Sequence, residues 1–376
     1  MGANCPDCGE LWMNAGPRGD YCASCGYTQT HGADKEPDGE QALDSLNTTQ
    51  ANALIQIGEK AQLFHDPLGM AYGRFDVSGH LETWPLDSRH WKTWLQHSFY
   101  KEYGLAPSSA AMISALGVLS GIAQFEGAEH TLYNRVAKFG DSTYYDLTDA
   151  AWRAVRIDST GWEIVDRPPI LFRRYSHQRP QVEPVHGGDI RDVIHFLNIP
   201  EGDRLLELCE LVTDFVPDIP HPIRDVYGEK GAAKSVSQRV RRRLIDPSAA
   251  ETLTFPRNAE ALAQMLSHNY APIFDNVDSI PPWLSDMLCR AVTGDGSSKR
   301  RLYSDDDDVI YSYRRVIMLN GINVVAQRPD LLDRTILYRL ERIPNTCGGV
   351  RRISGRSSRR RGRRYSEPSS KCYPLR

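Results

Sequence analysis

Residues 221–244 read HPIRDVYGEKGAAKSVSQRVRRRL, and this stretch decides the fold of the second half of the chain. A short strand-forming segment leads into the glycine-rich loop GEKGAAKS at 228–235, and a run suited to a helix follows it. In that order, the amides of the loop and the N-terminus of the helix converge on one point, where they bind phosphate oxygens. The stretch therefore predicts a domain that binds the phosphates of a nucleotide.

The loop matches the pattern G-x-x-x-x-G-K-[ST] at Gly228, Lys234 and Ser235. Ala233 stands where the pattern has its second glycine, and Gly231 lies two positions earlier. The methyl group of Ala233 is a small departure if that residue is already helical. Lys234 would bridge the β- and γ-phosphates of ATP, and the hydroxyl of Ser235 would bind Mg²⁺. We expect an α/β P-loop NTPase fold, a parallel sheet with flanking helices.

A second strand is predicted about forty residues on, in NYAPIFDNVDSI at 269–280, and it ends in Asp275. A carboxylate at the end of a strand near the phosphate loop is suited to hold Mg²⁺. Asn276 follows it, where many ring ATPases have a glutamate that orients the attacking water, and Asp278 lies two residues further on. Either Asp278 polarises the water or hydrolysis is slow.

The segment RRVIMLNGIN at 314–323 predicts a further core strand, and Asn320 at its end is suited to hydrogen-bond the γ-phosphate or the water. The segment RPDLLDRT at 328–335 follows. Its Arg328 and Arg334 are placed to act as an arginine finger toward a neighbouring subunit, which implies a homo-oligomeric ring. The alternative is that both arginines pair with the aspartates of their own segment.

Between these strands, glycines and serines at 294–298 predict a flexible turn, and Lys299, Arg300 and Arg301 follow it. A basic loop at this place could grip a phosphate backbone. Four aspartates at 305–308 favour the opposite interpretation, in which the charges neutralise one another on a solvated surface.

Cysteines crowd the first 25 residues in two Cys-x-x-Cys pairs. This spacing predicts a tetrahedral Zn²⁺ site, and the metal would supply the folding energy of so small a segment. The alternatives are a redox dithiol or a chance cluster. The four cysteines are Cys5, Cys8, Cys22 and Cys25. Two others, Cys209 and Cys289, lie in apolar runs and are interpreted as core residues.

The organisation along the chain follows from these motifs. We expect a zinc ribbon at 1–28, a linker at 29–50, an α+β domain at 51–198, the P-loop domain at 199–345 and a basic tail at 346–376. In the α+β domain, several polar residues have no spacing that demands a site, so structural or surface roles are expected. These are His65, Asp66, His80, Glu82, Arg135 and Asp146. Trp91 and Trp94, at helical spacing, are expected to anchor packing rather than stack on bases.

The formal net charge is −3, but residues 351–376 carry nine Arg and one Lys against one Glu, so the remainder carries about −12. Nucleic acid would therefore be bound locally rather than through overall charge. Taken at face value the tail is a disordered basic arm. We hypothesise instead a frameshifted or truncated end. No run of about 18 apolar residues and no signal-peptide pattern is present, so a cytoplasmic protein without a membrane partner is expected.

Taken together, GEKGAAKS, IFDNVD, MLNGIN and RPDLLDRT, preceded by an α+β region and paired cysteines, resemble the ATPase part of phage and prophage replication proteins. These are the D5-like primase-helicases and the wider superfamily 3 and AAA+ helicases. The resemblance covers residues 200–342, and more loosely 60–198. It implies an ATP-driven, ring-forming helicase that acts on DNA, single-stranded or at a replication fork. Priming is not implied, because no primase carboxylate pair is recognisable.

A second class of function stays open. The P-loop domain would then bind nucleotide as a switch, or be inactive, and the zinc ribbon would supply the contact of a nucleic-acid-binding or scaffold protein. An ATP-dependent transcriptional regulator is disfavoured, because no helix-turn-helix is recognisable.

Overall fold

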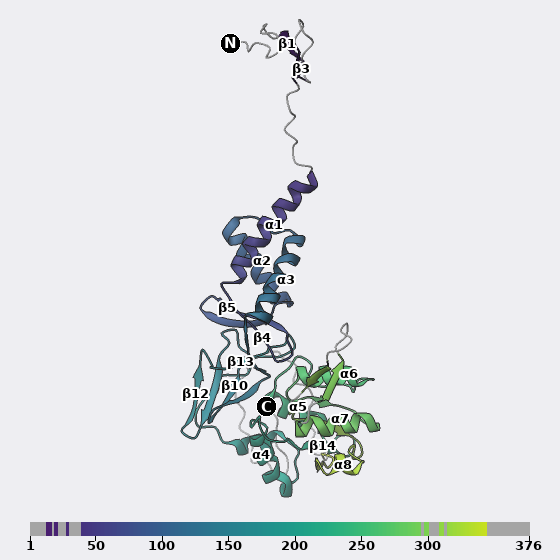
Figure 1. Cartoon of the computed structure of the whole chain (residues 1–376). Helices are drawn as coiled ribbons and strands as arrows, with labels where there is room; N and C mark the ends of the chain where they lie inside the picture. The colour runs from purple at the N-terminus through teal and green to yellow at the C-terminus, as the bar shows by residue number, and fades with distance from the viewer. Residues whose placement is uncertain are drawn as a thin grey trace, which may run out of the picture.

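The computed structural model describes residues 49–294 and 314–343 with their side chains (Figure 1). Further segments are described by their backbone alone: 13–16, 19–21, 28–29, 39–48, 297–300 and 308–311. The side chains of Cys5, Cys8, Cys22 and Cys25 lie outside the described residues, so the zinc site stays a prediction. The basic tail from residue 346 onward also lies outside them.

Three short strands come first: β1 (Met13–Gly16), β2 (Gly19–Tyr21) and β3 (Thr28–Gln29). They form an antiparallel sheet in the order β1-β2-β3. Two residues separate β1 from β2, a spacing typical of a tight hairpin. This hairpin falls, in the sequence, between the two Cys-x-x-Cys pairs.

A helical layer on a small sheet follows. Its helices are α1 (Gly39–Gly58), α2 (Arg89–Tyr103) and α3 (Ser109–Phe125). Its strands are β4 (Gln62–His65), β5 (Ala71–Val77), β6 (His80–Pro85) and β7 (Ala128–Glu129), in the order β6-β5-β4-β7. The side chains of Ser88 and Ser108 cap the N-termini of α2 and α3. Figure 1 shows the three helices packed together next to β4 and β5.

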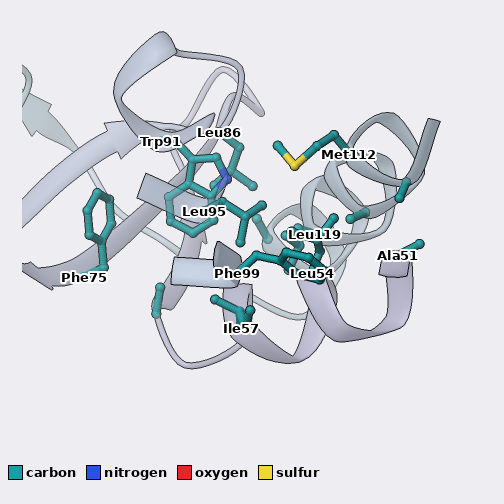
Figure 2. Packing of buried hydrophobic residues seen from close by; sticks show 14 of the residues in the cluster. Ala51, Leu54, Ile57, Phe75, Leu86, Trp91, Leu95, Phe99, Met112 and Leu119 are labelled. Atoms are coloured by element: carbon teal, nitrogen blue, oxygen red, sulfur yellow. The ribbon is translucent and has the colours of Figure 1, made fainter. Parts of the chain in front are cut away.

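The core of this layer is apolar. Trp91, Leu95 and Phe99 of α2 meet Leu54 of α1 and Leu119 of α3, as Figure 2 shows. Trp94 stacks on Phe75 with ring centroids 4.2 Å apart. Trp91 and Trp94 are thus packing residues, as the sequence predicts. A Cβ at Gly73 of β5 would lie 2.1 Å from the Trp91 ring, so only glycine lets the strand approach the indole.

The predicted linker at 29–50 is partly wrong, because α1 begins at Gly39. The polar composition of residues 39–50 suggested a linker, but Ala51, Leu54 and Ile57 bury one face of the same helix further on. Once that half is held by packing, each upstream residue adds one helical hydrogen bond at little cost. Packing of the C-terminal half therefore extends the helix into the more polar residues upstream.

A second sheet is made of four antiparallel strands in the order β12-β11-β10-β9. They are β9 (Val136–Phe139), β10 (Ser142–Asp146), β11 (Ala154–Asp158) and β12 (Gly161–Val165). Beside it, β8 (Leu132–Tyr133) pairs in parallel with β13 (Leu171–Phe172). The α+β class predicted for 51–198 is therefore what the structure shows.

The last part is a parallel sheet covered on both faces. Its strands are β14 (Ile223–Tyr227), β15 (Ile273–Phe274), β18 (Met318–Gly321) and β19 (Thr335–Arg339), in the order β15-β18-β14-β19. Its helices are η1 (Ile190–Phe196), η2 (Glu201–Asp203), α4 (Arg204–Thr213), α5 (Lys234–Ile245), α6 (Ala259–His268), α7 (Pro282–Thr293) and α8 (Pro329–Leu332). The α/β fold predicted for this half is confirmed.

Alternate residues of the strands serve different faces of this sheet. Ile317 and Leu319 pack with α6, α7 and α8, whereas Val316 and Met318 pack with α4, α5 and the sheet β9–β12. Both faces are buried, as is usual for parallel sheets. A two-stranded antiparallel hairpin, β16 (Ser297–Arg300) and β17 (Asp308–Tyr311), lies between α7 and β18 in the sequence.

The predicted boundary at 198/199 is not a break in packing. Val136 and Tyr145 of the second sheet share a core with Ile245 and Met318 of the parallel sheet. Arg135 Nε also donates to Asp246 Oδ1 at 3.0 Å, and both side chains are buried. The second sheet and the P-loop region therefore form one packed unit.

The other polar residues singled out in this region have local structural contacts. Asp66 accepts the amides of Leu68 and Met70 in a turn, and His80 contacts Glu82 at 3.1 Å. Asp146 pairs with Arg174. These contacts agree with the structural roles expected for them.

The core assignment of two cysteines needs correction. Cys209 is exposed on α4, and Cys289 is only partly buried against the α7 core. Apolar neighbours in the sequence misled the prediction, because a helix turns one face to solvent even in an apolar run. Within the described residues, no helix combines the length and apolarity needed to cross a bilayer.

Candidate nucleotide-binding site

The loop between β14 and α5 changes direction at two glycines. Gly228 has φ 143° and Gly231 has φ 88°, both in the region that glycine favours. A Cβ at Gly228 would lie 2.2 Å from the carbonyl oxygen of Leu340, just after β19. The loop therefore passes too close to the neighbouring strand to tolerate any side chain at this position.

Ala233 adopts a left-handed conformation, with φ 57° and ψ 26°. The interpretation that its methyl group is harmless required a right-handed helical residue, and that is wrong. An L-residue in this region is strained by about 1–2 kcal/mol. The backbone path of the motif demands glycine here, and this chain holds the same path with alanine.

The backbone amides of the loop point to an anion site. Among the described residues, no acceptor partners the amides of Glu229, Lys230, Gly231, Ala233, Lys234 or Ser235. The first amides of a helix have no acceptor within that helix and carry the positive end of its dipole. The twelve-residue helix α5 begins at Lys234, so its dipole adds to the loop amides. The chemistry of these groups suits phosphate oxygens.

The side chain of Lys234 lies over this loop. Its Nζ donates to the carbonyl oxygens of Gly228 at 2.7 Å and Glu229 at 3.0 Å. Burial lowers the pKa of this ammonium below its ordinary value. Two backbone carbonyls accept hydrogen bonds from this ammonium, and Asp275 also interacts with its charge, so a bound phosphate group can replace the carbonyls as its partner.

Ser235, Asp275 and Asn320 meet at the carboxyl edge of the sheet. Asn320 Nδ2 donates to Ser235 Oγ at 2.8 Å and to Asp275 Oδ1 at 2.5 Å. Ser235 Oγ also donates to Asp275 Oδ1, at 3.3 Å. The three residues come from α5, the end of β15 and β18. Parallel strands end at one edge, which is where α/β sheets bind ligands.

The backbone conformation at position 276 favours asparagine. Its φ is 56°, a left-handed value that asparagine tolerates better than glutamate does, and its amide donates to Asp275 Oδ1 at 2.9 Å. Asp278 is exposed. Within the described part of the chain, no hydrogen bond joins Asp278 to Ser235, Asp275 or Asn320. The water-polarising role of Asp278 stays a prediction.

The two candidate finger arginines lie away from this cluster. Arg334 Nη1 donates to the carbonyl of Asp330, and its own carbonyl accepts from Ile223 at the start of β14. It therefore lies at the amino edge of the sheet, opposite the phosphate loop. Arg328 pairs with Asp286 at 2.9 Å rather than with an aspartate of its own segment. Neither arginine reaches the loop of its own chain.

The predicted flexible turn at 294–298 has a defined backbone at both ends. Gly294 ends α7 in a left-handed conformation, and Ser297 begins β16, which pairs with β17. Lys299 and Arg300 lie on β16, but the side chains of the hairpin are outside the described residues. Whether they bind phosphates stays a prediction.

A buried ionic cluster lies beneath the loop and was missed in the sequence. Arg224 of β14 contacts Glu210 of α4 through Nη1 at 2.7 Å, and its guanidinium carbon lies 4.0 Å from the centroid of the Tyr338 ring. Asp225 accepts the amides of Val325 and Ala326. The sequence did contain an indication of this cluster, because the segment IRDVY at 223–227 places Arg224 and Asp225 inside a strand that is otherwise apolar. Such charges persist only when they are paired.

The donor set fits a Mg²⁺–nucleotide. A hydroxyl from Ser235 and a carboxylate from Asp275 are hard oxygen ligands, and Mg²⁺ commonly takes one or two of these plus waters and phosphates. Asn320 adds a third polar group at the same point. No cluster of three or more His, Cys, Asp or Glu suited to a metal occurs among residues 49–294 and 314–343.

Residues 192–353 match the family model described as the Actinomycete integrative conjugative element replication protein. Among solved structures, the chain is similar to the apo C-terminal region of NrS-1, with 10% identity and a TM-score of 0.39, over 79% of this chain and 61% of that one. It is also similar to JCV helicase bound to an acetamide compound, with 15% identity and a TM-score of 0.28, over 42% of this chain and 47% of that one. No curated protein matches the chain. The chain thus spans about three fifths of the NrS-1 region and about half of the JCV helicase chain.

Proposed function

We propose that residues 192–343 bind ATP with Mg²⁺ at the loop 228–235 and hydrolyse it, as the motor of a DNA helicase-like replication protein of a mobile element. The observation that carries the proposal is the meeting of Ser235, Asp275 and Asn320 beside the open amide cradle of the loop. The family match over 192–353 supports the replication context.

In this proposal each residue has one task. The loop amides and Lys234 bind the phosphates and neutralise their charge. Ser235 and Asp275 hold Mg²⁺, which when bound supplies a Lewis acid beside the phosphates. Asn320 donates a hydrogen bond toward the γ-phosphate or the attacking water.

The partner in the proposal is DNA, and the active form is a homo-oligomeric ring. If Arg334 is the arginine finger, its target is the site of another subunit, because Arg334 lies at the amino edge of its own sheet, opposite its own loop. The four N-terminal cysteines would bind Zn²⁺ and form a second, tethered module.

One observation favours a second candidate, a nucleotide-dependent switch with slow turnover. Asn276 takes the place of the water-orienting carboxylate, and Asp278 has no hydrogen bond to the cluster among the described residues. Such a protein would bind ATP tightly and hydrolyse it without stimulation by DNA.

Steady-state ATP turnover with and without single-stranded and double-stranded DNA separates the two candidates. The motor predicts stimulation by DNA and a loss of about a hundredfold or more in Lys234→Ala. Lys230→Ala is the matched control, since Lys230 is exposed on the same loop and has no side-chain contact among the described residues. ATP binding without DNA-stimulated turnover would favour the switch.

A mixing experiment tests the ring. Lys234→Ala and Arg334→Ala should each lose turnover alone, and mixed subunits should recover part of it, because some interfaces then pair an intact loop with an intact arginine. No recovery on mixing, with subunit exchange shown by mass measurement, would contradict a finger acting between subunits.

A further inference from the structure

A cleft of about 940 Å³ separates the second sheet and its neighbouring loops from helix α6 and the amino edge of the parallel sheet. One wall comes from the β4–β5 turn, β8 and the residues after β13, including Tyr133, Arg173 and Tyr175. The other wall includes His268 at the end of α6 and Arg315 before β18. The cleft lies at the opposite edge of the sheet from the phosphate loop, so it is not part of the proposed ATP site.

Arg173 lines this cleft and lies between two aromatic rings. Its guanidinium lies 5.8 Å from the Tyr72 ring centroid and 5.2 Å from that of Tyr175, and Nη2 contacts the sulfur of Met70. Within the described residues, no carboxylate forms an ion pair with it. The phenol of Tyr72 is held by Asp66 at 3.3 Å, so the ring that supports Arg173 is itself fixed. A half-buried arginine held by two aromatic faces leaves its N–H groups available for an oxyanion.

Aromatic rings from both walls of the cleft lie near this point. Tyr175 and His268 pack with centroids 4.2 Å apart, and Tyr133 lies on β8 beside β13. Each of these rings is only partly buried. Flat, partly exposed rings beside a cation are the pattern that binds bases next to phosphates in single strands.

Charged side chains of both signs line the cleft. The cations are Lys138, Arg173, Arg314 and Arg315, and the carboxylates are Asp66, Asp218 and Glu260. Lys138 pairs with Asp218 at 2.6 Å, and Asp66 is occupied by two amides and Tyr72. Glu260, in the first turn of α6, is the remaining acid and lies on the wall opposite Arg173. The surplus of positive charge therefore rests on the arginines.

The cleft also leads to the hairpin. Gly294 and Arg314 line it, and they flank the segment that carries β16 and β17. A Cβ at Gly294 would lie 2.9 Å from Arg314 Nε, so the two ends of this segment meet at the cleft. A chain-like ligand leaving the cleft here would pass the base of the hairpin, where Ser297 pairs with Tyr311.

We propose that this cleft binds a short segment of single-stranded nucleic acid, with phosphates at Arg173 and bases against Tyr133, Tyr175 and His268. The continuity of the cleft with the two ends of the hairpin segment favours a strand over a free nucleotide. The inference rests on the proposed function in taking nucleic acid as the partner, and it adds a site remote from the motor.

Binding of a fluorescently labelled oligothymidylate to the full chain, without ATP, tests the site by anisotropy. Arg173→Gln should weaken binding about tenfold and reduce the slope of log affinity against log salt by about one. Arg173→Lys should keep the salt slope. The matched control is Arg191→Gln, since Arg191 is exposed, lies outside the cleft and already pairs with Asp189; its binding should equal that of the wild type.

Two results would overturn the assignment. One is wild-type affinity and salt slope in a folded Arg173→Gln protein, and the other is full displacement of the oligonucleotide by free thymidine monophosphate. If Arg173→Gln does not fold, photocrosslinking of iodouracil-substituted oligonucleotide to the wild type replaces it. Crosslinks at Tyr133, Tyr175 or His268 support the site, and crosslinks confined to other residues reject it.

The same preparations separate this inference from the motor. Binding of ATP to Arg173→Gln should equal that of the wild type, while Lys234→Ala should lose ATP and keep the oligonucleotide. A wild type that binds no ATP but shows Arg173-dependent oligonucleotide binding would reject the motor and leave the cleft standing.

Discussion

At the carboxyl edge of the parallel sheet, Ser235, Asp275 and Asn320 lie within hydrogen-bond distance of one another beside an amide-lined loop. At the amino edge, Arg173, Tyr175 and Arg315 line an open cleft shared with the second sheet. The first edge has small polar groups at fixed positions, as binding and cleaving a phosphate requires. The second has long cations and flat rings over a wide area, as a strand of any sequence requires.

The largest effect is expected from Asn320 at the carboxyl edge. Asn320→Ala removes the group that donates to both Ser235 and Asp275, so ATP turnover should fall by about a hundredfold with little change in ATP affinity. Asn323→Ala, two residues beyond β18 and exposed, is the control. Equal turnover in both variants would remove Asn320 from the site.

Gly228→Ala tests whether the close approach between the loop and the Leu340 carbonyl contributes to stability. The new methyl group would meet the Leu340 carbonyl in a backbone conformation that L-residues rarely adopt, so the free energy of unfolding should fall by about 3 kcal/mol. Gly79→Ala is matched, since it has a positive φ of 96° and open space around it, and should cost about 1 kcal/mol. Denaturant unfolding measures both, and equal losses would show that the close approach is unimportant.

Ala233→Gly should stabilise the protein. Ala233 is left-handed, and glycine removes a strain of about 1 kcal/mol at that conformation. A rise in the unfolding free energy of that size, with ATP affinity equal or tighter, would confirm that the loop path is that of the glycine motif. A destabilised variant would mean that the alanine methyl contributes packing that outweighs the strain.

A pH dependence of stability is expected from the amino edge. His221 is buried, neither ring nitrogen has a hydrogen-bond partner among the described residues, and burial lowers its pKa from 6.5 to about 4. The unfolded chain therefore binds a proton that the folded chain does not, and stability falls as the pH falls from about 6.5 toward about 4. His221→Phe should flatten this part of the stability curve, while His97→Phe, at an exposed position, should not. An unchanged curve in His221→Phe would place the dependence elsewhere.

Much of the carboxyl edge follows from the sequence, for a definite reason. A parallel sheet brings the ends of its strands together, so Asp275 and Asn320 at strand ends had to lie near the loop that follows β14. The helix that begins at Lys234 follows equally from the motif. The conformation of Ala233 did not follow, because it depends on how the loop passes Leu340, which is 107 positions away in the chain.

The cleft at the amino edge of the parallel sheet could not be predicted from the sequence. The residues of this cleft come from the β4–β5 turn, β8, β13, α6 and the segment before β18, and no spacing connects them. Arg173 looks in the sequence like one of a pair in FRRY, yet Arg174 is buried against Asp146 while Arg173 lines the cleft. The helix α1 was missed for a related reason, since its packing partners lie on α2 and α3.

Equilibrium binding of a fluorescent ATP analogue with Mg²⁺ tests the central claim most directly. The wild type and Lys230→Ala should bind alike, and Lys234→Ala should bind at least about tenfold more weakly, because it loses the ammonium group that lies over the loop. Equal binding by all three proteins, or none by the wild type, would contradict a nucleotide site at residues 228–235.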